Sequence, residues 1–121
     1  MEKRIRSFKY AGRGIKKAIS SEVNIRIHLA ITLGVVIAGF ILEINTIEWM
    51  ICLLCFGMVL GLEMLNTAIE KTVDLASPNL HPLAGSAKDI AAGGVLISAI
   101  TAACIGMIIF TPKLIDYFNL A

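Results

Sequence analysis

The chain has 121 residues, of which 57% are hydrophobic and only 17% are charged, and its mean hydropathy is +0.81. Soluble globular domains contain about 25% charged residues, so this composition excludes a soluble enzyme with a separate cofactor domain, and it also excludes a disordered tail. The length allows one domain, and the composition favours a small integral membrane protein whose net charge of +2 is unevenly distributed.

The first 21 residues are strongly basic and are predicted to form an amphipathic helix. Seven of the eleven Lys and Arg residues lie within the first 17 positions. Between them, apolar or small residues recur at spacings of three and four, the period of a helical face: Ile5, Phe8, Gly12, Ile15 and Ile19. Because this segment runs directly into hydrophobic chain, we expect it to lie on the membrane surface and not to bind nucleic acid.

Three apolar segments follow, and we expect each of them to cross the membrane as a helix. Their approximate ranges are 25–44, 47–74 and 87–112. The third is the clearest, because residues 90–112 contain no charged side chain and a helix needs about 20 residues to cross a bilayer. The second crosses only if Glu63 is accepted at membrane depth. The predicted fold is therefore a single all-α membrane domain over residues 1–121, with a surface helix at 1–21 and three transmembrane helices.

The distribution of positive charge predicts the orientation in the membrane. The N-terminal segment is basic, whereas the connection at 43–48 contains no Lys or Arg. By the positive-inside rule, the N-terminus lies in the cytoplasm, the connection at 43–48 lies outside, and the loop at 71–89 returns to the cytoplasm. A cleaved signal peptide is not expected. We therefore predict a multi-pass protein of the plasma membrane whose active site faces the cytoplasm.

The second apolar segment carries a stripe of polar residues. Glu63, Asn66, Glu70 and Asp74 are separated by three, four and four residues, and this spacing puts them on one face of a helix. At 1.5 Å per residue, Glu63 lies roughly 10 Å deeper than Glu70. An ionisable group at membrane depth is costly and is by default a functional hypothesis. The alternative is an acid that is protonated or paired with a neighbouring helix, and Asp74 at the helix end also suits a solvated structural charge.

Three more charged residues are expected at the same membrane face, namely Glu22, Lys88 and Asp89. Carboxylates bind Mg²⁺ together with substrate phosphates, and a lysine neutralises phosphate oxygens. A deeper carboxylate takes a proton from a hydroxyl group at the interface. These parts suit phosphoryl transfer from a nucleotide to an alcohol dissolved in the membrane. The glycine-rich P-loop and the protein-kinase motifs are absent from the sequence, so these residues alone do not name a substrate.

The polar residues belong to longer motifs that resemble the prokaryotic diacylglycerol kinase family. The two main motifs are GLEMLNTAIEKTVD at 61–74 and AKDIAAGGVL at 87–96, and the N-terminal SFKYA at 7–11 with Gly14 matches as well. The resemblance covers about residues 4–112. It implies a homotrimer of three-span subunits, arranged as a trimeric helical bundle in which neighbouring chains share the active sites.

The resemblance also implies roles for individual residues. Glu63 would be the general base that deprotonates the lipid hydroxyl, and Asn66 would orient Glu63 or the acceptor. Glu22 and Glu70 would ligate the Mg²⁺ that bridges the ATP phosphates. The residues implied in nucleotide binding are Tyr10, Glu22, Glu70, His81, Lys88 and Asp89.

The lipid acceptor is indicated by a separate stretch, EVNIRIH at 22–28. It is similar to the Gram-positive branch of the family, whose members phosphorylate undecaprenol. The resemblance thus implies an ATP-dependent kinase that makes undecaprenyl phosphate. Two alternatives stay open: a diacylglycerol kinase that makes phosphatidic acid, and a non-enzymatic pore former or small transporter subunit. His28, at the start of an apolar span, is more typical of an interface hydrogen-bonding residue than of a catalyst.

Overall fold

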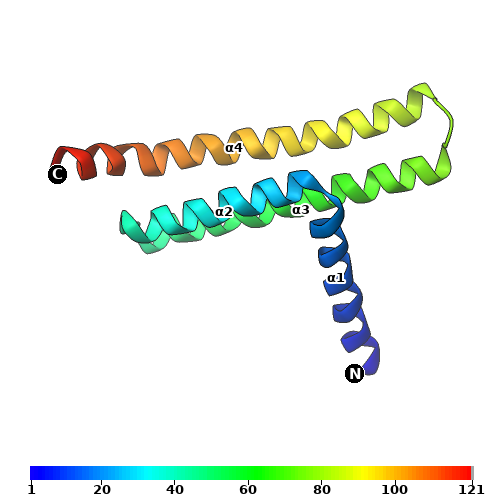
Figure 1. The fold of residues 1–121 in the computed structure, drawn as a ribbon, viewed down its shortest axis with the longest axis horizontal. Helices are drawn as coiled ribbons and strands as arrows, with labels where there is room; N and C mark the ends of the chain where they lie inside the picture. Colours follow the sequence, from blue (N-terminus) through cyan, green and yellow to red (C-terminus); the bar gives the residue numbers. More distant parts are fainter. Residues whose placement is uncertain (121) are drawn as a thin grey trace.

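The computed structural model describes residues 1–120, and of Leu120 only the backbone. Every regular element in this range is an α-helix, and no strand is found in it, which confirms the predicted all-α class (Figure 1). The helices are α1 Glu2–Ser21, α2 Val23–Ile41, α3 Thr46–Ala76 and α4 Pro82–Leu120. Helices α2, α3 and α4 are each long and apolar enough to cross a membrane. The predicted domain at 1–121 includes Ala121, which lies outside the described residues.

Helix α3 is the centre of the molecule. It forms an antiparallel hairpin with α4 and also packs against α2 (Figure 1). The small core lies between the N-terminal half of α3 and the C-terminal half of α4, where Ile44, Cys52 and Ile109 are buried. Most other apolar side chains are exposed, as expected for a chain that buries its surface in lipid or against other subunits.

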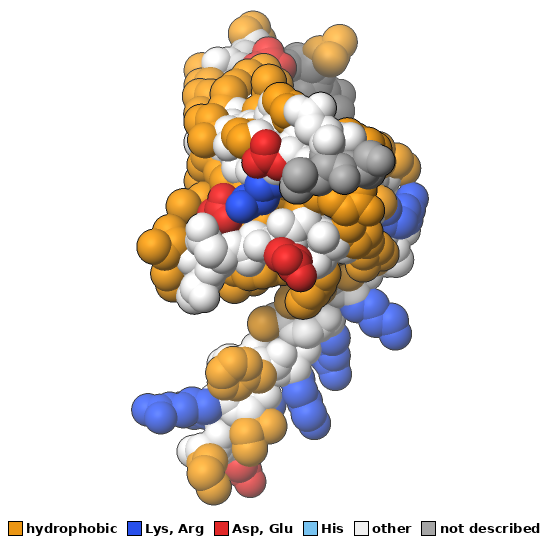
Figure 2. Space-filling model, turned by 90° about the vertical axis from the view of Figure 1, so that its left-hand side faces the viewer, with side chains coloured by type: hydrophobic (Ala, Val, Ile, Leu, Met, Phe, Trp, Pro, Cys, Tyr) orange, Lys and Arg blue, Asp and Glu red, His pale blue; other side chains and the backbone are white. Residues whose placement is uncertain are grey.

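Helix α1 projects away from the other three helices (Figure 1). Only Glu22 separates α1 from α2, and its backbone is extended, with φ −114° and ψ 117°. The Arg26 guanidinium donates hydrogen bonds to the carbonyl oxygens of Ile19, at 3.1 Å, and Ser20, at 3.0 Å. These bonds satisfy free carbonyls at the end of α1 and hold the turn that carries Glu22. Figure 2 shows the Lys and Arg side chains spread along α1, outside the largely apolar bundle.

The turn between α2 and α3 has a well-defined local cause. The Ile44 amide donates to the Gly39 carbonyl at 3.1 Å, and Glu43 has a φ of +51°, which together form a Schellman-type helix end. Gly39 is required by packing, because a Cβ atom there would lie 2.7 Å from the Trp49 ring. Trp49 also packs on Phe40, with ring centroids 4.9 Å apart.

The start of α3 is fixed by a capping box. The Asn45 side chain accepts from the Glu48 amide at 2.9 Å, and the Glu48 carboxylate accepts from the Asn45 amide at 3.0 Å. Glu48 also pairs with Lys113 on α4, with the nitrogen 3.1 Å from the carboxylate oxygen. One glutamate thus caps α3 and ties it to the far end of α4.

Helix α4 is longer than the expected 87–112 at both ends. Pro82 fits the first position of a helix, where its missing N–H group has no helical partner, and the His81 Nδ1 atom accepts from the Leu83 amide at 3.1 Å. At the other end α4 continues through Pro112. Lys113 directly follows this proline and pairs with Glu48 of α3, and the pair holds the last part of α4 against α3.

Candidate active site

Glu63 is buried in the middle of α3, with only 3% of its surface exposed. Its Oε2 atom lies 3.8 Å from Nε2 of His28 on α2, a distance that suits an ion pair and is too long for a hydrogen bond. The Glu63 backbone carbonyl accepts a hydrogen bond from the buried Thr67 hydroxyl at 3.1 Å. The sequence left open that Glu63 is paired with a neighbouring helix, and the structure has such a pair; its role as a base stays a prediction.

Asn66 lies one turn after Glu63 and is also buried. Its Nδ2 atom donates to Oε1 of Glu70 at 3.3 Å. Its Oδ1 atom is buried and has no hydrogen-bond partner among the described residues, and such an atom costs about 1–3 kcal/mol. An acceptor of this kind is suited to a hydroxyl group or a cation that comes with a ligand. The expected common face of Glu63, Asn66 and Glu70 is consistent with these contacts.

The stripe on α3 continues to an ion pair with α4. The Lys88 ammonium group binds the Asp74 carboxylate, and Glu70 adds a Coulombic attraction to the same ammonium. We call Asn66, Glu70, Asp74 and Lys88 the α3–α4 cluster. The sequence predicts that Asp74 and Lys88 lie at one membrane face, but it does not predict that they pair. The signal was the position of both residues just before and just after the turn of the α3–α4 hairpin.

The other four predicted site residues are not bonded to this cluster in the described part of the chain. Tyr10 is on the projecting part of α1, exposed, with the Arg13 guanidinium 5.6 Å from its ring centre. His81 is exposed and its Nδ1 atom is used at the start of α4. Glu22 is half-buried at the α1–α2 junction, and Asp89 is exposed on α4. Within residues 1–120, no hydrogen bond or ion pair joins any of these four to the α3–α4 cluster.

The predicted magnesium site would use two carboxylates, those of Glu22 and Glu70. In the described part of the chain, no group of three or more His, Cys, Asp or Glu side chains is close enough to hold a metal ion. Mg²⁺ needs only one or two carboxylates when substrate phosphates supply further oxygens. The half-buried Glu70 carboxylate and the free Oδ1 atom of Asn66 are oxygen donors of the required kind. The residues therefore fit the ion, and the magnesium assignment stays a prediction.

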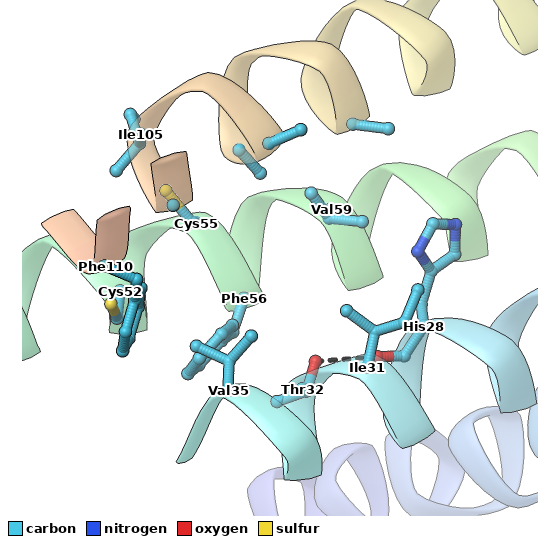
Figure 3. Close-up of a pocket in the computed structure, with 14 residues that line it drawn as sticks. His28, Ile31, Thr32, Val35, Cys52, Cys55, Phe56, Val59, Ile105 and Phe110 are labelled. Atoms are coloured by element: carbon cyan, nitrogen blue, oxygen red, sulfur yellow. Dashed lines mark hydrogen bonds between the residues drawn. The ribbon is translucent and has the colours of Figure 1, made fainter. Parts of the chain in front are cut away.

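A cavity of about 260 Å³ lies between α2, α3 and α4. In Figure 3, the His28 imidazole lies at one end of it, and Cys52 and Phe110 lie at the other. Apart from His28 and Thr32, whose hydroxyl donates to the His28 carbonyl at 2.8 Å, the wall is apolar or thiol-bearing. The cavity thus has a polar end beside Glu63 and a long apolar remainder.

Sequence reasoning missed this cavity, although a signal for it exists. Small residues of α4 that line the wall recur at helical spacing: Ala99, Ala102, Ala103 and Gly106. A stripe of small side chains leaves room between helices that larger side chains would fill. The sequence analysis also gave His28 no specific partner, because nothing in a local pattern shows which side chain of another helix it faces.

Comparisons with known proteins agree with the motifs. The prokaryotic diacylglycerol kinase family matches residues 9–110. A Bacillus subtilis (strain 168) protein named undecaprenol kinase is 50% identical over 109 residues, which is 90% of this chain and 89% of that protein. A diacylglycerol kinase of Synechocystis is 39% identical over 111 residues, or 91% of this chain and 63% of that longer protein. The diacylglycerol kinase of Escherichia coli (strain K12) is 34% identical over 99 residues, covering 81% of this chain and 80% of that protein.

These matches confirm the resemblance that the motifs indicated. The matched range contains the stripe on α3, the paired Lys88 and the lining of the cavity. Identity is higher to the undecaprenol kinase than to the two diacylglycerol kinases, in line with the similarity seen at 22–28. The chain belongs to the prokaryotic diacylglycerol kinase family.

Proposed function

We propose that this protein is an ATP-dependent lipid kinase that transfers the γ-phosphoryl group of Mg-ATP to the hydroxyl of undecaprenol, giving undecaprenyl phosphate and ADP. The observation that carries the proposal is the buried Glu63 carboxylate beside the polar end of an apolar cavity. Family membership supports the reaction class, and the 50% identity to the Bacillus undecaprenol kinase supports the acceptor.

Glu63 acts as the general base in this proposal. The hydroxyl oxygen of the lipid attacks the γ-phosphorus, the bond between that phosphorus and the ADP oxygen breaks, and the hydroxyl proton passes to Glu63. The first apolar units of the lipid enter the cavity at the end formed by His28. This placement holds the lipid hydroxyl near the Glu63 carboxylate. The unpartnered Oδ1 of Asn66 accepts a hydrogen bond from the hydroxyl as it arrives and so orients it. A general base contributes about 10²–10⁴-fold to such a rate.

The nucleotide binds at the outer part of the stripe. Glu70, held by Asn66, and Glu22 would hold the Mg²⁺ ion, and this ion would neutralise charge on the ATP phosphates. Lys88 contacts the phosphates, and Asp74 holds its ammonium group in place before ATP arrives. Tyr10, His81 and Asp89 complete the nucleotide site.

We further propose a homotrimer with shared active sites. In one chain, no hydrogen bond or ion pair of the described range joins Tyr10, Glu22, His81 or Asp89 to the α3–α4 cluster, and α1 projects from the bundle (Figure 1). A neighbouring subunit offers a route by which α1 reaches a site it does not reach in its own chain. The basic α1 lies along the cytoplasmic surface of the plasma membrane, with the active site on that side.

Phosphorylation assays with two lipids test the proposal. Purified protein in detergent micelles is given Mg-ATP and either undecaprenol or diacylglycerol, and lipid phosphate is counted. We expect faster turnover of undecaprenol. Faster turnover of diacylglycerol would favour the family's other activity, for which the Synechocystis and Escherichia coli relatives are named. No phosphorylation of either lipid, together with solute flux through protein-containing vesicles, would favour the pore or transporter subunit.

A further inference from the structure

His28 is the residue through which α2 contacts the proposed base. Its Nε2 atom lies 3.8 Å from Oε2 of Glu63, and the two side chains are 21% and 4% exposed. The same imidazole forms the polar end of the cavity between α2, α3 and α4 (Figure 3). His28 therefore touches both the carboxylate and the space in which the acceptor hydroxyl is proposed to lie.

The buried Glu63 carboxylate needs a partner to stay ionised. Removing a carboxylate from water costs several kcal/mol unless an opposite charge or hydrogen bonds compensate. A base that takes a proton has to be ionised when the substrate arrives. The His28 imidazole lies at ion-pair distance, so its protonated form would supply this compensation. A shift of about 1 Å on substrate binding would turn the contact into a charge-assisted hydrogen bond, and catalytic contacts commonly tighten in this way.

The other ionisable groups around Glu63 have different partners. Arg26 on α2 turns back to the carbonyls at the end of α1. Lys88 on α4 is paired with Asp74. On α3 itself, Glu70 lies two turns away and accepts from Asn66. From α1, no charged side chain of the described residues pairs with Glu63, and Glu22 lies at the α1–α2 junction. Within residues 1–120, His28 is the basic side chain that lies within ion-pair distance of Glu63.

We propose that His28 is a positioning residue for the kinase reaction: it holds the Glu63 carboxylate ionised and directed at the mouth of the cavity. This inference rests on the proposed function, because it gives Glu63 the role of base. It also explains why a histidine is placed at the start of an apolar span. His28 acts on the step that uses the lipid hydroxyl and not on nucleotide binding, because the α3–α4 cluster lies further along α3.

Two substitutions of His28 separate its charge from its shape. His28→Gln keeps a hydrogen-bond donor but removes the charge, and His28→Leu removes both. The matched control is Ser98→Ala, which alters another buried polar side chain, one that bonds only to its own helix at Val95. The readouts are kcat with undecaprenol, the apparent KM for Mg-ATP, and the pH dependence of kcat, together with thermal unfolding in micelles to show that each variant is folded.

We expect His28→Leu to lower kcat at least tenfold, because it would remove part of the 10²–10⁴-fold that acid–base catalysis typically contributes. The KM for Mg-ATP should stay within about twofold of the wild-type value. The pH dependence of its kcat should differ from that of the wild type, because the Glu63 carboxylate loses the side chain that lies 3.8 Å from it. His28→Gln should fall between Leu and the wild type, and Ser98→Ala should match the wild type in kcat and pH profile.

An unchanged kcat and pH profile in both His28 variants would overturn the inference while leaving the proposed function intact. A parallel loss of kcat and Mg-ATP affinity in both would also overturn it, because a merely structural role would act in that way. If His28→Leu does not fold, the kcat and the pH dependence of kcat of His28→Gln decide whether the inference holds. A wild-type protein that phosphorylates neither lipid would instead overturn the proposed function, and with it the role of His28.

Discussion

Replacement of Glu63 by Gln is the sharpest test of the proposed chemistry. The substitution keeps the size of the side chain and removes only its charge and its basicity. Loss of a general base lowers kcat by about 10²–10⁴-fold, or about 2.7–5.4 kcal/mol at 1.36 kcal/mol per tenfold change. Mg-ATP binding should be retained, because Glu70 lies seven residues further along α3, roughly 10 Å along the helix axis at 1.5 Å per residue. The substitution leaves His28 without its partner carboxylate, and loss of one partner of a buried pair lowers stability, so thermal unfolding has to show that the variant is folded.

The assay measures kcat for undecaprenol, the affinity for Mg-ATP and thermal unfolding in the same detergent. Glu48→Gln is the matched control, because it makes the same chemical change on the same helix. Glu48 caps α3 and pairs with Lys113 at the opposite end of the bundle, so this control should lose stability and keep its kcat. Full turnover in Glu63→Gln, or a loss of nucleotide binding together with turnover, would refute the assignment of Glu63 as the base.

Three further predictions follow from the structure. Lys88→Ala should raise the apparent KM for Mg-ATP tenfold or more, since hydrogen bonds to charged groups contribute about 1.5–3 kcal/mol; an unchanged KM would remove Lys88 from the nucleotide site. Gly39→Ala should destabilise the protein by about 1–3 kcal/mol in thermal unfolding, because its Cβ would meet the Trp49 ring at 2.7 Å, whereas Gly34→Ala, with no atom within 4 Å, should not. Gly106→Leu should fill part of the cavity and raise the KM for undecaprenol without changing the KM for Mg-ATP. If the variant and the wild type have equal KM values for undecaprenol, the lipid chain lies outside this cavity.

The helices could be predicted because their signals are local. Apolar runs and the period of three and four residues arise from each segment's own side chains, and all four expected helices are present. The ends of α4 could not be predicted as well, because the preceding loop is expected to reach residue 89 and the uncharged apolar run ends at residue 112. Pro82 instead begins the helix, and Pro112 is accommodated inside it, with Lys113 held by Glu48 of another helix. That contact depends on tertiary packing.

The contacts of the site also fall into those that could be predicted from local sequence and those that depend on tertiary packing. The spacing of Glu63, Asn66 and Glu70 follows from helix geometry alone, and the hydrogen bond from Asn66 to Glu70 joins residues four apart on one helix. Pairs between helices need more information, because they depend on how far each helix is rotated about its own axis. The contacts of Lys88 with Asp74 and of His28 with Glu63 are both of this kind.

The amino-acid sequence by itself determined that this chain forms membrane helices, that α3 carries a polar stripe, and that its motifs are those of a lipid kinase family. The tertiary structure decided which side chain faces the buried carboxylate and where an apolar cavity opens beside it. The physical reason is that helix formation and the sharing of a face depend on neighbours within a few residues along the chain. Partners across helices depend on packing, which the whole fold sets at once.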